Sequence, residues 1–221
     1  MPRRALVEHR PWLLSAMVAA VAFYFLREDS LAGLRPIGGT WLILLKGAAV
    51  GCLALYALRR SHATDARILA AVLALSALGD MAIELWLEAG GALFFASHLA
   101  ALSLYLRNLR PNPTASQKAL AVTLLIVTPL ACWQISGSAQ VGLYGLALGG
   151  MAATAWMSRF PRYRVGMGAV LFVFSDLLIF ANAGPLQGSA IPGVLIWPLY
   201  FLGQFLIAIG VIQTLRRDHK V

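Results

Sequence analysis

The sequence has little charge and little sulfur. Only 12% of its 221 residues are Asp, Glu, Lys or Arg, and nine of these are acidic. The two cysteines, Cys52 and Cys132, both fall within apolar runs, so we expect small buried side chains and neither a disulfide nor a metal site. Long polar stretches are missing too: every connection between apolar runs is short. These absences exclude a water-soluble globular protein.

The sequence instead contains many long hydrophobic segments. Its residues are 60% hydrophobic, with a mean hydropathy of +0.76. Runs of about 15 to 22 apolar residues recur, and such runs are long enough to cross a bilayer. Eight transmembrane helices are predicted, over residues 11–26, 38–58, 67–87, 91–106, 116–135, 140–158, 165–183 and 194–215. The predicted fold is an all-α, polytopic membrane helix bundle, with residues 1–221 forming a single integral membrane domain.

The net charge is +9, and the basic residues that produce it are distributed unevenly between the two predicted sides of the membrane. If the loops alternate between two sides, fifteen of the eighteen basic residues fall on one side, in the segments 3–10, 59–67, 107–118, 159–164 and 216–220. The other side holds Arg27 and Arg35, and Lys46 lies within a predicted helix. By the positive-inside rule, both termini are then cytoplasmic. We expect these charges to set topology and meet anionic headgroups, and we expect no nucleic-acid partner.

Residues 67–106 are predicted to form two membrane-spanning helices joined by a tight turn at Gly90-Gly91. Polar side chains spaced four apart share one face of the first helix: Ser76, Asp80 and Glu84. The second helix carries His98 at depth. A carboxylate in hydrocarbon costs roughly 2.5 kcal/mol or more, so Asp80 is interpreted as functional. The alternative is a buried polar contact that holds the helix register.

A second hairpin has the same arrangement. Asp176 follows Ser175 near the middle of one predicted helix, and Tyr200 and Gln204 lie one turn apart on the next. At 1.5 Å per residue, these groups and those of the first hairpin lie near the midplane of a core about 30 Å thick. One polar cavity can therefore hold them all, and a four-plus-four helix duplication is a possible origin.

Three other predicted helices carry weaker signals. Lys46 lies only ~9 Å from the outer end of its helix, so it either snorkels to the interface or meets a carboxylate or a lipid phosphate. Segments 116–135 and 140–158 have no charge in their middle and are assigned no chemistry. The glycines of 140–158 predict a helix that packs closely against its neighbours.

Two motifs resemble the YhhN family. The first is S-x-x-G-D followed by a helix with S-H, at Ser76, Gly79, Asp80 and His98. The second is G-A-x-L-F-x-x-S-D followed by Y-x-x-x-Q, at Gly168, Ala169, Leu171, Phe172, Ser175, Asp176, Tyr200 and Gln204. Lys46 also resembles the lysine in the second helix of that family.

The family consists of multi-pass membrane proteins and includes the lysoplasmalogenases. The resemblance implies a lysoplasmalogenase-like hydrolase of the cell membrane, in bacteria the inner membrane. Its substrate would be a lysoplasmalogen, a 1-alkenyl-glycerophosphocholine or -ethanolamine. Cleavage of the vinyl-ether bond would release a fatty aldehyde and a glycerophospho-base. No cofactor and no metal are expected, and the partners are this lysophospholipid and the bilayer.

Vinyl-ether hydrolysis needs a proton donor to carbon and an anion near the oxocarbenium ion that forms. Two carboxyls can divide these roles, as in glycoside hydrolysis, when one is kept protonated by burial and the other ionised by hydrogen-bond donors. Asp80 and Asp176 are predicted to be this pair, and which is the acid is left open. His98 would orient groups or relay protons.

The remaining polar residues are predicted to bind substrate: Lys46, Ser76, Glu84, Ser175, Tyr200 and Gln204. Tyr200 and Gln204 would position water or the headgroup. The two serines would bond to an aspartate or to carbonyls of their own helix, in preference to acting as nucleophiles. Glu84 is either an entrance charge or a catalytic group.

Three rival functions remain. A zinc hydrolase would need His98 with two carboxylates, because the other histidines lie in cytoplasmic segments. A proton-coupled transporter or channel would use the same buried charges as a proton relay. A purely structural membrane protein explains two aspartates at the midplane poorly.

Overall fold

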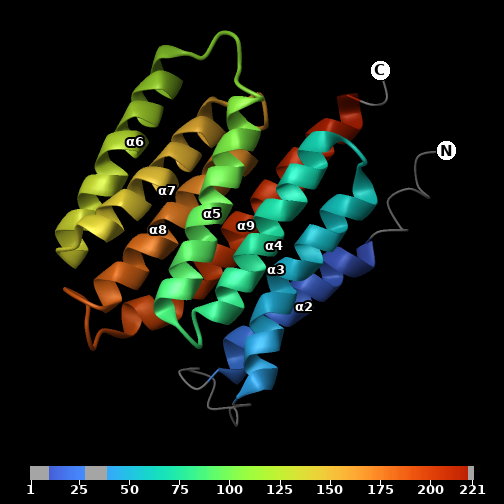
Figure 1. The fold of residues 1–221 in the computed structure, drawn as a ribbon. Coiled ribbons are helices and arrows are strands. Elements are labelled where there is room, and N and C mark those ends of the chain that lie inside the picture. Colours follow the sequence, from blue (N-terminus) through green and yellow to red (C-terminus); the bar gives the residue numbers. More distant parts are fainter. Residues whose placement is uncertain (1–9, 28–38, 219–221) are drawn as a thin grey trace. The chain divides into compact units, whose positions relative to one another are not determined.

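The computed structural model describes residues 10–27 and 39–218. In these two ranges the chain forms eight α-helices, a short π-helix and no β-strand (Figure 1). The elements are α2 (Arg10–Leu26), α3 (Thr40–Arg60), α4 (Thr64–Ala82), α5 (Leu87–Leu106), α6 (Ala115–Ser136), α7 (Ala139–Met157), η1 (Arg162–Gly166), α8 (Met167–Asn182) and α9 (Ala190–Asp218). The prediction of eight helices and an all-α fold is confirmed.

Five of these helical segments are long and apolar enough to cross a membrane: Thr40–Arg60, Leu87–Leu106, Ala115–Ser136, Arg162–Asn182 and Ala190–Asp218. The apolar segment Pro11–Leu26 is shorter. Helix α4 is not among these five, and it carries three charged residues, Asp65, Arg67 and Asp80. The protein is therefore a membrane protein. The number of helices that cross the bilayer and the side of the termini stay predictions.

The turn of the first hairpin is not where the sequence placed it. Helix α5 begins at Leu87, so Gly90 and Gly91 lie inside it and the turn occupies residues 83–86. Gly90 is needed for close packing, because a Cβ there would lie 2.6 Å from the Cβ of Ile83. Glu84 therefore lies in the turn, and only Ser76 and Asp80 of the predicted polar stripe are on α4.

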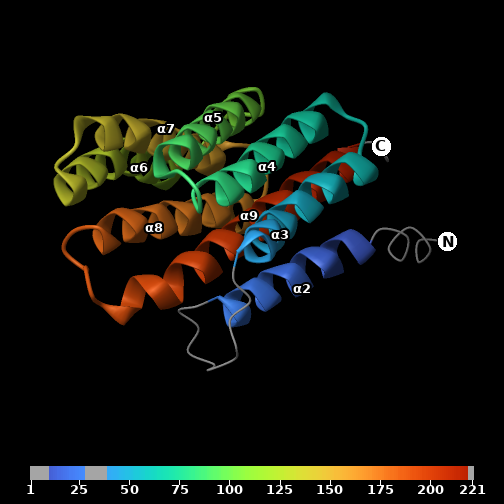
Figure 2. The same ribbon diagram turned by 60° about the horizontal axis from the view of Figure 1, so that its bottom comes forward.

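Contacts divide the chain into two units. The first contains α2, α3, α4 and α5 up to Ser97, together with the chain from Leu215 on, and the second is His98–Thr214. In the first unit, α3 packs against both α2 and α4, as both views show (Figures 1 and 2). In the second, α6 and α7 pack against each other, and both contact α8. The predicted single domain and internal repeat stay predictions.

Small residues bring helices of the second unit into backbone contact. A Cβ on Gly149 of α7 would lie 2.6 Å from the carbonyl oxygen of Leu124 in α6. This confirms that residues 140–158 form a closely packed helix. A Cβ on Gly168 of α8 would likewise lie 2.6 Å from the carbonyl oxygen of Gly203 in α9. The α8–α9 contact therefore depends on glycine, as is common between helices in membranes.

Gly168→Ala is expected to lower stability by about 1 to 3 kcal/mol, because the added methyl group must push α8 away from the α9 backbone. Thermal unfolding of the detergent-solubilised protein measures the effect. Gly91→Ala is the matched control, since its Cβ would meet nothing within 4 Å. Equal melting temperatures for the two variants would contradict the close α8–α9 contact.

Candidate functional site

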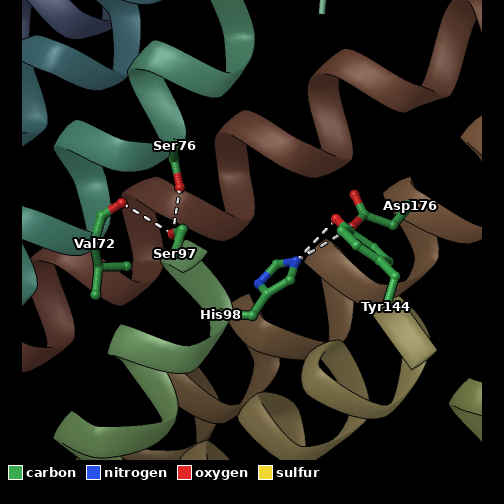
Figure 3. Close-up of polar contacts among 6 residues, drawn as sticks. All are labelled: Val72, Ser76, Ser97, His98, Tyr144 and Asp176. Carbon is green, nitrogen blue, oxygen red and sulfur yellow. Dashed lines mark hydrogen bonds and ion pairs between the residues drawn. The ribbon is translucent and has the colours of Figure 1, made fainter. Parts of the chain in front are cut away.

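Three side chains from different helices meet in the second unit. His98 lies on α5, Tyr144 on α7 and Asp176 on α8 (Figure 3). The Tyr144 hydroxyl donates to Oδ2 of Asp176 at 2.6 Å, and its oxygen lies 3.0 Å from Nε2 of His98. Nε2 of His98 lies 3.6 Å from the same Oδ2. We call these residues the His–Tyr–Asp cluster.

The Tyr144 hydroxyl has one proton, so its two hydrogen bonds constrain each other. When Asp176 is ionised, the hydroxyl donates to the carboxylate and its oxygen accepts from Nε2–H of His98. When Asp176 is protonated, the carboxyl can donate to the Tyr144 oxygen, whose proton then points to an unprotonated Nε2. When Nδ1 of His98 carries a proton in both arrangements, His98 is an imidazolium in the first and neutral in the second, and the two differ only by the shift of two protons along this path. The hydroxyl can therefore relay a proton between His98 and Asp176.

Burial and aromatic rings surround this cluster. His98 is 1% exposed and Asp176 is 4% exposed. The Phe172 ring packs edge-on against His98, with centroids 5.0 Å apart, and Phe180 packs against Tyr144 at 5.7 Å. Water is largely excluded, so electrostatic interactions in the cluster are stronger than they would be in water.

One oxygen of Asp176 remains available for chemistry. Both of its polar contacts reach Oδ2, and Oδ1 accepts no hydrogen bond from residues 10–27 or 39–218. A carboxylate oxygen can accept further hydrogen bonds. A substrate or a water molecule can therefore bond to Oδ1.

Gln204 on α9 has a similar unfilled position. Its side chain is 1% exposed, and Nε2 finds no hydrogen-bond partner within the described part of the chain. Tyr200, one turn earlier, is also buried, and its ring packs against Phe172 at a centroid distance of 5.1 Å. Phe172 thus contacts both His98 and Tyr200 in the second unit. The Gln204 amide can donate to a bound water or ligand.

The two predicted serines bond to other helices instead. Ser97 on α5 donates to the carbonyl oxygen of Val72 at 3.0 Å, so Ser76 donates its own proton to Ser97 at 2.8 Å (Figure 3). Ser175 donates to the carbonyl oxygen of Ile196 in α9 at 3.0 Å. The prediction that they bond to an aspartate or to their own helices is wrong, because a neighbouring helix supplies a closer partner. Ser97, the serine of the S-H motif, was assigned no role from the sequence.

Lys46 lies in the first unit and pairs with Glu84. Nζ of Lys46 lies 2.5 Å from Oε1 of Glu84 and 5.6 Å from the centroid of the Phe23 ring. The Lys46 side chain is 14% exposed and that of Glu84 is 39% exposed. Of the two interpretations of Lys46, the structure supports the contact with a carboxylate.

Asp80 on α4 is 2% exposed and belongs to the first unit, whereas Asp176 belongs to the second. Its pairing with Asp176 stays a prediction. Among the described residues, no group of three or more His, Cys, Asp or Glu side chains is placed to hold a metal ion.

Tyr144 is the member of the His–Tyr–Asp cluster that sequence reasoning missed. The segment 140–158 was assigned no chemistry because it lacks charge, yet Tyr144 on this segment bonds to two of the predicted site residues. A phenol in an apolar helix gives no charge signal, and only the contacts of Tyr144 with His98 and Asp176 reveal it.

Comparison with known proteins identifies the family. The model of the YhhN family matches residues 41–211, a range that contains all the candidate residues above. Searches among curated proteins and among solved structures find no significant match.

Proposed function

This chain belongs to the YhhN family, and from that premise we propose that it is a membrane-embedded hydrolase of the lysoplasmalogenase type. Its substrate is a lysoplasmalogen with a choline or ethanolamine headgroup. It cleaves the vinyl-ether bond and releases a fatty aldehyde and a glycerophospho-base. The observation that carries the proposal is the buried His–Tyr–Asp cluster, which can deliver a proton in a nearly water-free site.

The reaction begins with a proton transfer to carbon. A carboxylic acid protonates the alkenyl carbon that is not bonded to oxygen, and the π electrons form the new C–H bond. The cation that remains is shared between the adjacent carbon and the ether oxygen. Water adds to that carbon and gives up a proton, and the resulting hemiacetal collapses to the aldehyde and the glycerol hydroxyl. The site must therefore supply an acid, a base and a nearby anion.

In this proposal Asp176 is the acid. Protonated at Oδ1, it donates to the alkenyl carbon and is left as a carboxylate beside the cation. Tyr144 and His98 then return a proton to Oδ2 along their hydrogen bonds, and rotation of the carboxyl group brings that proton to face the substrate. Asp80 is the second carboxyl, which stabilises the cation and takes the proton from the attacking water. His98 takes its replacement proton from water, and Asp80 releases to water the proton that it accepted.

The other polar residues either bind substrate and water or position helices. The Gln204 amide, which lacks a partner in the described residues, donates to the attacking water, with Tyr200 one turn away. Lys46 and Glu84 interact with the headgroup. Ser76 and Ser175 act by positioning helices, through Ser97 and the carbonyl oxygen of Ile196.

The test is aldehyde release by the full chain in a non-ionic detergent. A 1-alkenyl lysophosphatidylcholine is expected to yield aldehyde, and the matched 1-alkyl lipid is not, because a saturated ether has no alkene carbon to protonate. Absence of aldehyde from every 1-alkenyl lysolipid would contradict the proposal. Proton flux into proteoliposomes without bond cleavage would then identify a transporter or channel.

A further inference from the structure

The Lys46–Glu84 ion pair lies outside the His–Tyr–Asp cluster and takes no part in the proton relay. We propose that this pair is the headgroup site and that it binds a zwitterionic lysophospholipid by exchanging partners. Lys46 would take the phosphate and Glu84 would take the ammonium group. This inference rests on the proposed function, because it names the part of the protein that selects the substrate.

The two charges are close together and accessible from outside. Nζ of Lys46 and Oε1 of Glu84 are 2.5 Å apart, and 39% of the Glu84 side chain is exposed. The Lys46 side chain is only 14% exposed, and the Phe23 ring lies beside its ammonium group. A half-buried cation is poorly hydrated, so an anionic oxygen that replaces Glu84 is bound more strongly than at a fully exposed lysine.

Close packing on both sides keeps the pair in place. Next to Lys46, a Cβ on Gly47 would lie 2.5 Å from Met81 of α4, so α3 and α4 are in close contact there. Next to Glu84, Ile83 packs against Gly90 at the start of α5. The backbones that carry the two charges are therefore closely packed against neighbouring segments, which limits the entropy cost of binding.

A pair of opposite charges in the protein selects a headgroup that also carries one positive and one negative charge. A phosphocholine or phosphoethanolamine headgroup carries an anion and a cation a short distance apart, so both protein charges keep a partner when it binds. A phosphate without an amine would satisfy Lys46 and leave Glu84 facing a second negative charge. An unpaired or repelled charge is costly, so the site discriminates against such lipids.

The position of the pair suits the chemistry assigned to Asp80. Glu84 comes four residues after Asp80, and the amide of Ile83 still bonds to the carbonyl oxygen of Gly79 at 2.9 Å, so the backbone is helical up to the turn. The backbone of Glu84 is thus about one helical turn, ~6 Å along the axis, beyond that of Asp80. In a lysoplasmalogen the glycerol backbone separates the phosphate from the vinyl ether. A headgroup held by Lys46 and Glu84 would leave the vinyl ether free to extend toward the level of Asp80.

Binding of a lipid that cannot be cleaved tests the proposal without hydrolysis. Isothermal titration of the full chain in a non-ionic detergent would compare 1-alkyl-lysophosphatidylcholine with 1-alkyl-lysophosphatidic acid, which lacks the amine. We expect the wild-type protein to prefer the zwitterionic lipid by about tenfold. Glu84→Gln should lose this preference, and Lys46→Gln should weaken the binding of both lipids about tenfold.

Matched variants separate headgroup binding from loss of charge in general. Glu88→Gln and Lys118→Gln remove a charge from exposed positions on α5 and α6 and should retain wild-type binding. Wild-type affinity in folded Glu84→Gln and Lys46→Gln proteins would overturn the proposal. Glycerophosphocholine should bind more weakly than the lipid. Equal affinity would show that a soluble headgroup is the ligand and would overturn the lipid assignment.

The ion pair could also serve only to hold α3 against the turn after α4, and single variants would then weaken the protein without revealing a binding site. A double variant that exchanges the two charges separates these roles. Combining Lys46→Glu with Glu84→Lys rebuilds the pair with reversed polarity and should recover most of the thermal stability lost by either single variant. The headgroup site predicts that the preference for the zwitterionic lipid is not recovered, and recovery of both would overturn it. If wild-type binding is selective but no aldehyde is released from a 1-alkenyl lipid, the headgroup site stands and the hydrolase proposal fails.

Discussion

Asp176→Asn is expected to reduce aldehyde release from a lysoplasmalogen by roughly 10³-fold. Asparagine keeps the shape of the side chain and still accepts a hydrogen bond from Tyr144, but it cannot give a proton to carbon. The loss should appear in kcat, because the carboxyl acts on the reacting atoms. Steady-state kinetics with a 1-alkenyl lysophosphatidylcholine would measure it.

The control for this variant is Asp65→Asn. It makes the same chemical change in the first turn of α4, away from the proposed chemistry, and should keep wild-type activity. A melting temperature close to wild type would show that Asp176→Asn is folded. Activity above a tenth of the wild-type value in a folded Asp176→Asn protein would rule out Asp176 as the proton donor.

Asp80→Asn tests the division of roles between the two carboxyls. As the base and stabilising anion, Asp80 should contribute a loss in kcat of the same order, roughly 10²- to 10³-fold. If only Asp176→Asn is inactive, then Asp176 serves as acid and base in turn. In that mechanism the Asp176 carboxylate takes the proton from the attacking water directly, and the two-aspartate mechanism would then be wrong.

Tyr144→Phe should lower kcat by about tenfold to a hundredfold, with little change in KM. Phenylalanine preserves the ring contacts with His98 and Phe180 but removes the oxygen that joins His98 to Asp176. The proton must then pass over the 3.6 Å between Nε2 and Oδ2, which is longer than a hydrogen bond. Comparison of kcat and KM, with a pH profile of kcat, would reveal the change.

Tyr56→Phe is the matched control for that variant. Tyr56 is also buried in a helix, at 4% exposure on α3, and lies in the other unit. Its phenol should be dispensable for turnover. An unchanged kcat and pH profile in Tyr144→Phe would show that the phenol only packs against its neighbours, and the relay would be discarded.

The helices could be predicted because the bilayer imposes a simple length rule. A run of about 20 apolar residues is long enough to cross the hydrocarbon core, and all eight predicted runs became helices. The ends were less certain. Helix α4 ends at Ala82 and α5 begins at Leu87, because Gly90 allows close packing against Ile83 where the sequence pattern pointed to a turn.

Only the ionisable residues of the site could be predicted from the sequence. Asp176 and His98 stood out because ionisable groups in a membrane span are costly, and the structure brings them together. Tyr144 did not stand out, and Ser97 was seen only as part of the S-H motif, since a phenol and a hydroxyl are tolerated in apolar helices with or without a function. The predicted partners of Ser76 and Ser175 were wrong. The sequence indicates only carbonyl groups on the same helix, whereas the observed partners lie on a neighbouring helix.

By itself, the sequence determined the membrane class, the helices and the buried ionisable residues, because each follows from the cost of transferring particular groups into hydrocarbon. The tertiary structure alone decided which groups share a proton. Tyr144 lies 46 residues from His98 and 32 from Asp176 along the chain, and their hydrogen bonds depend on how α5, α7 and α8 pack. Spacing along one helix cannot encode contacts among three helices. The packing of their side chains determines such contacts, as it does for the pairing of Lys46 with Glu84.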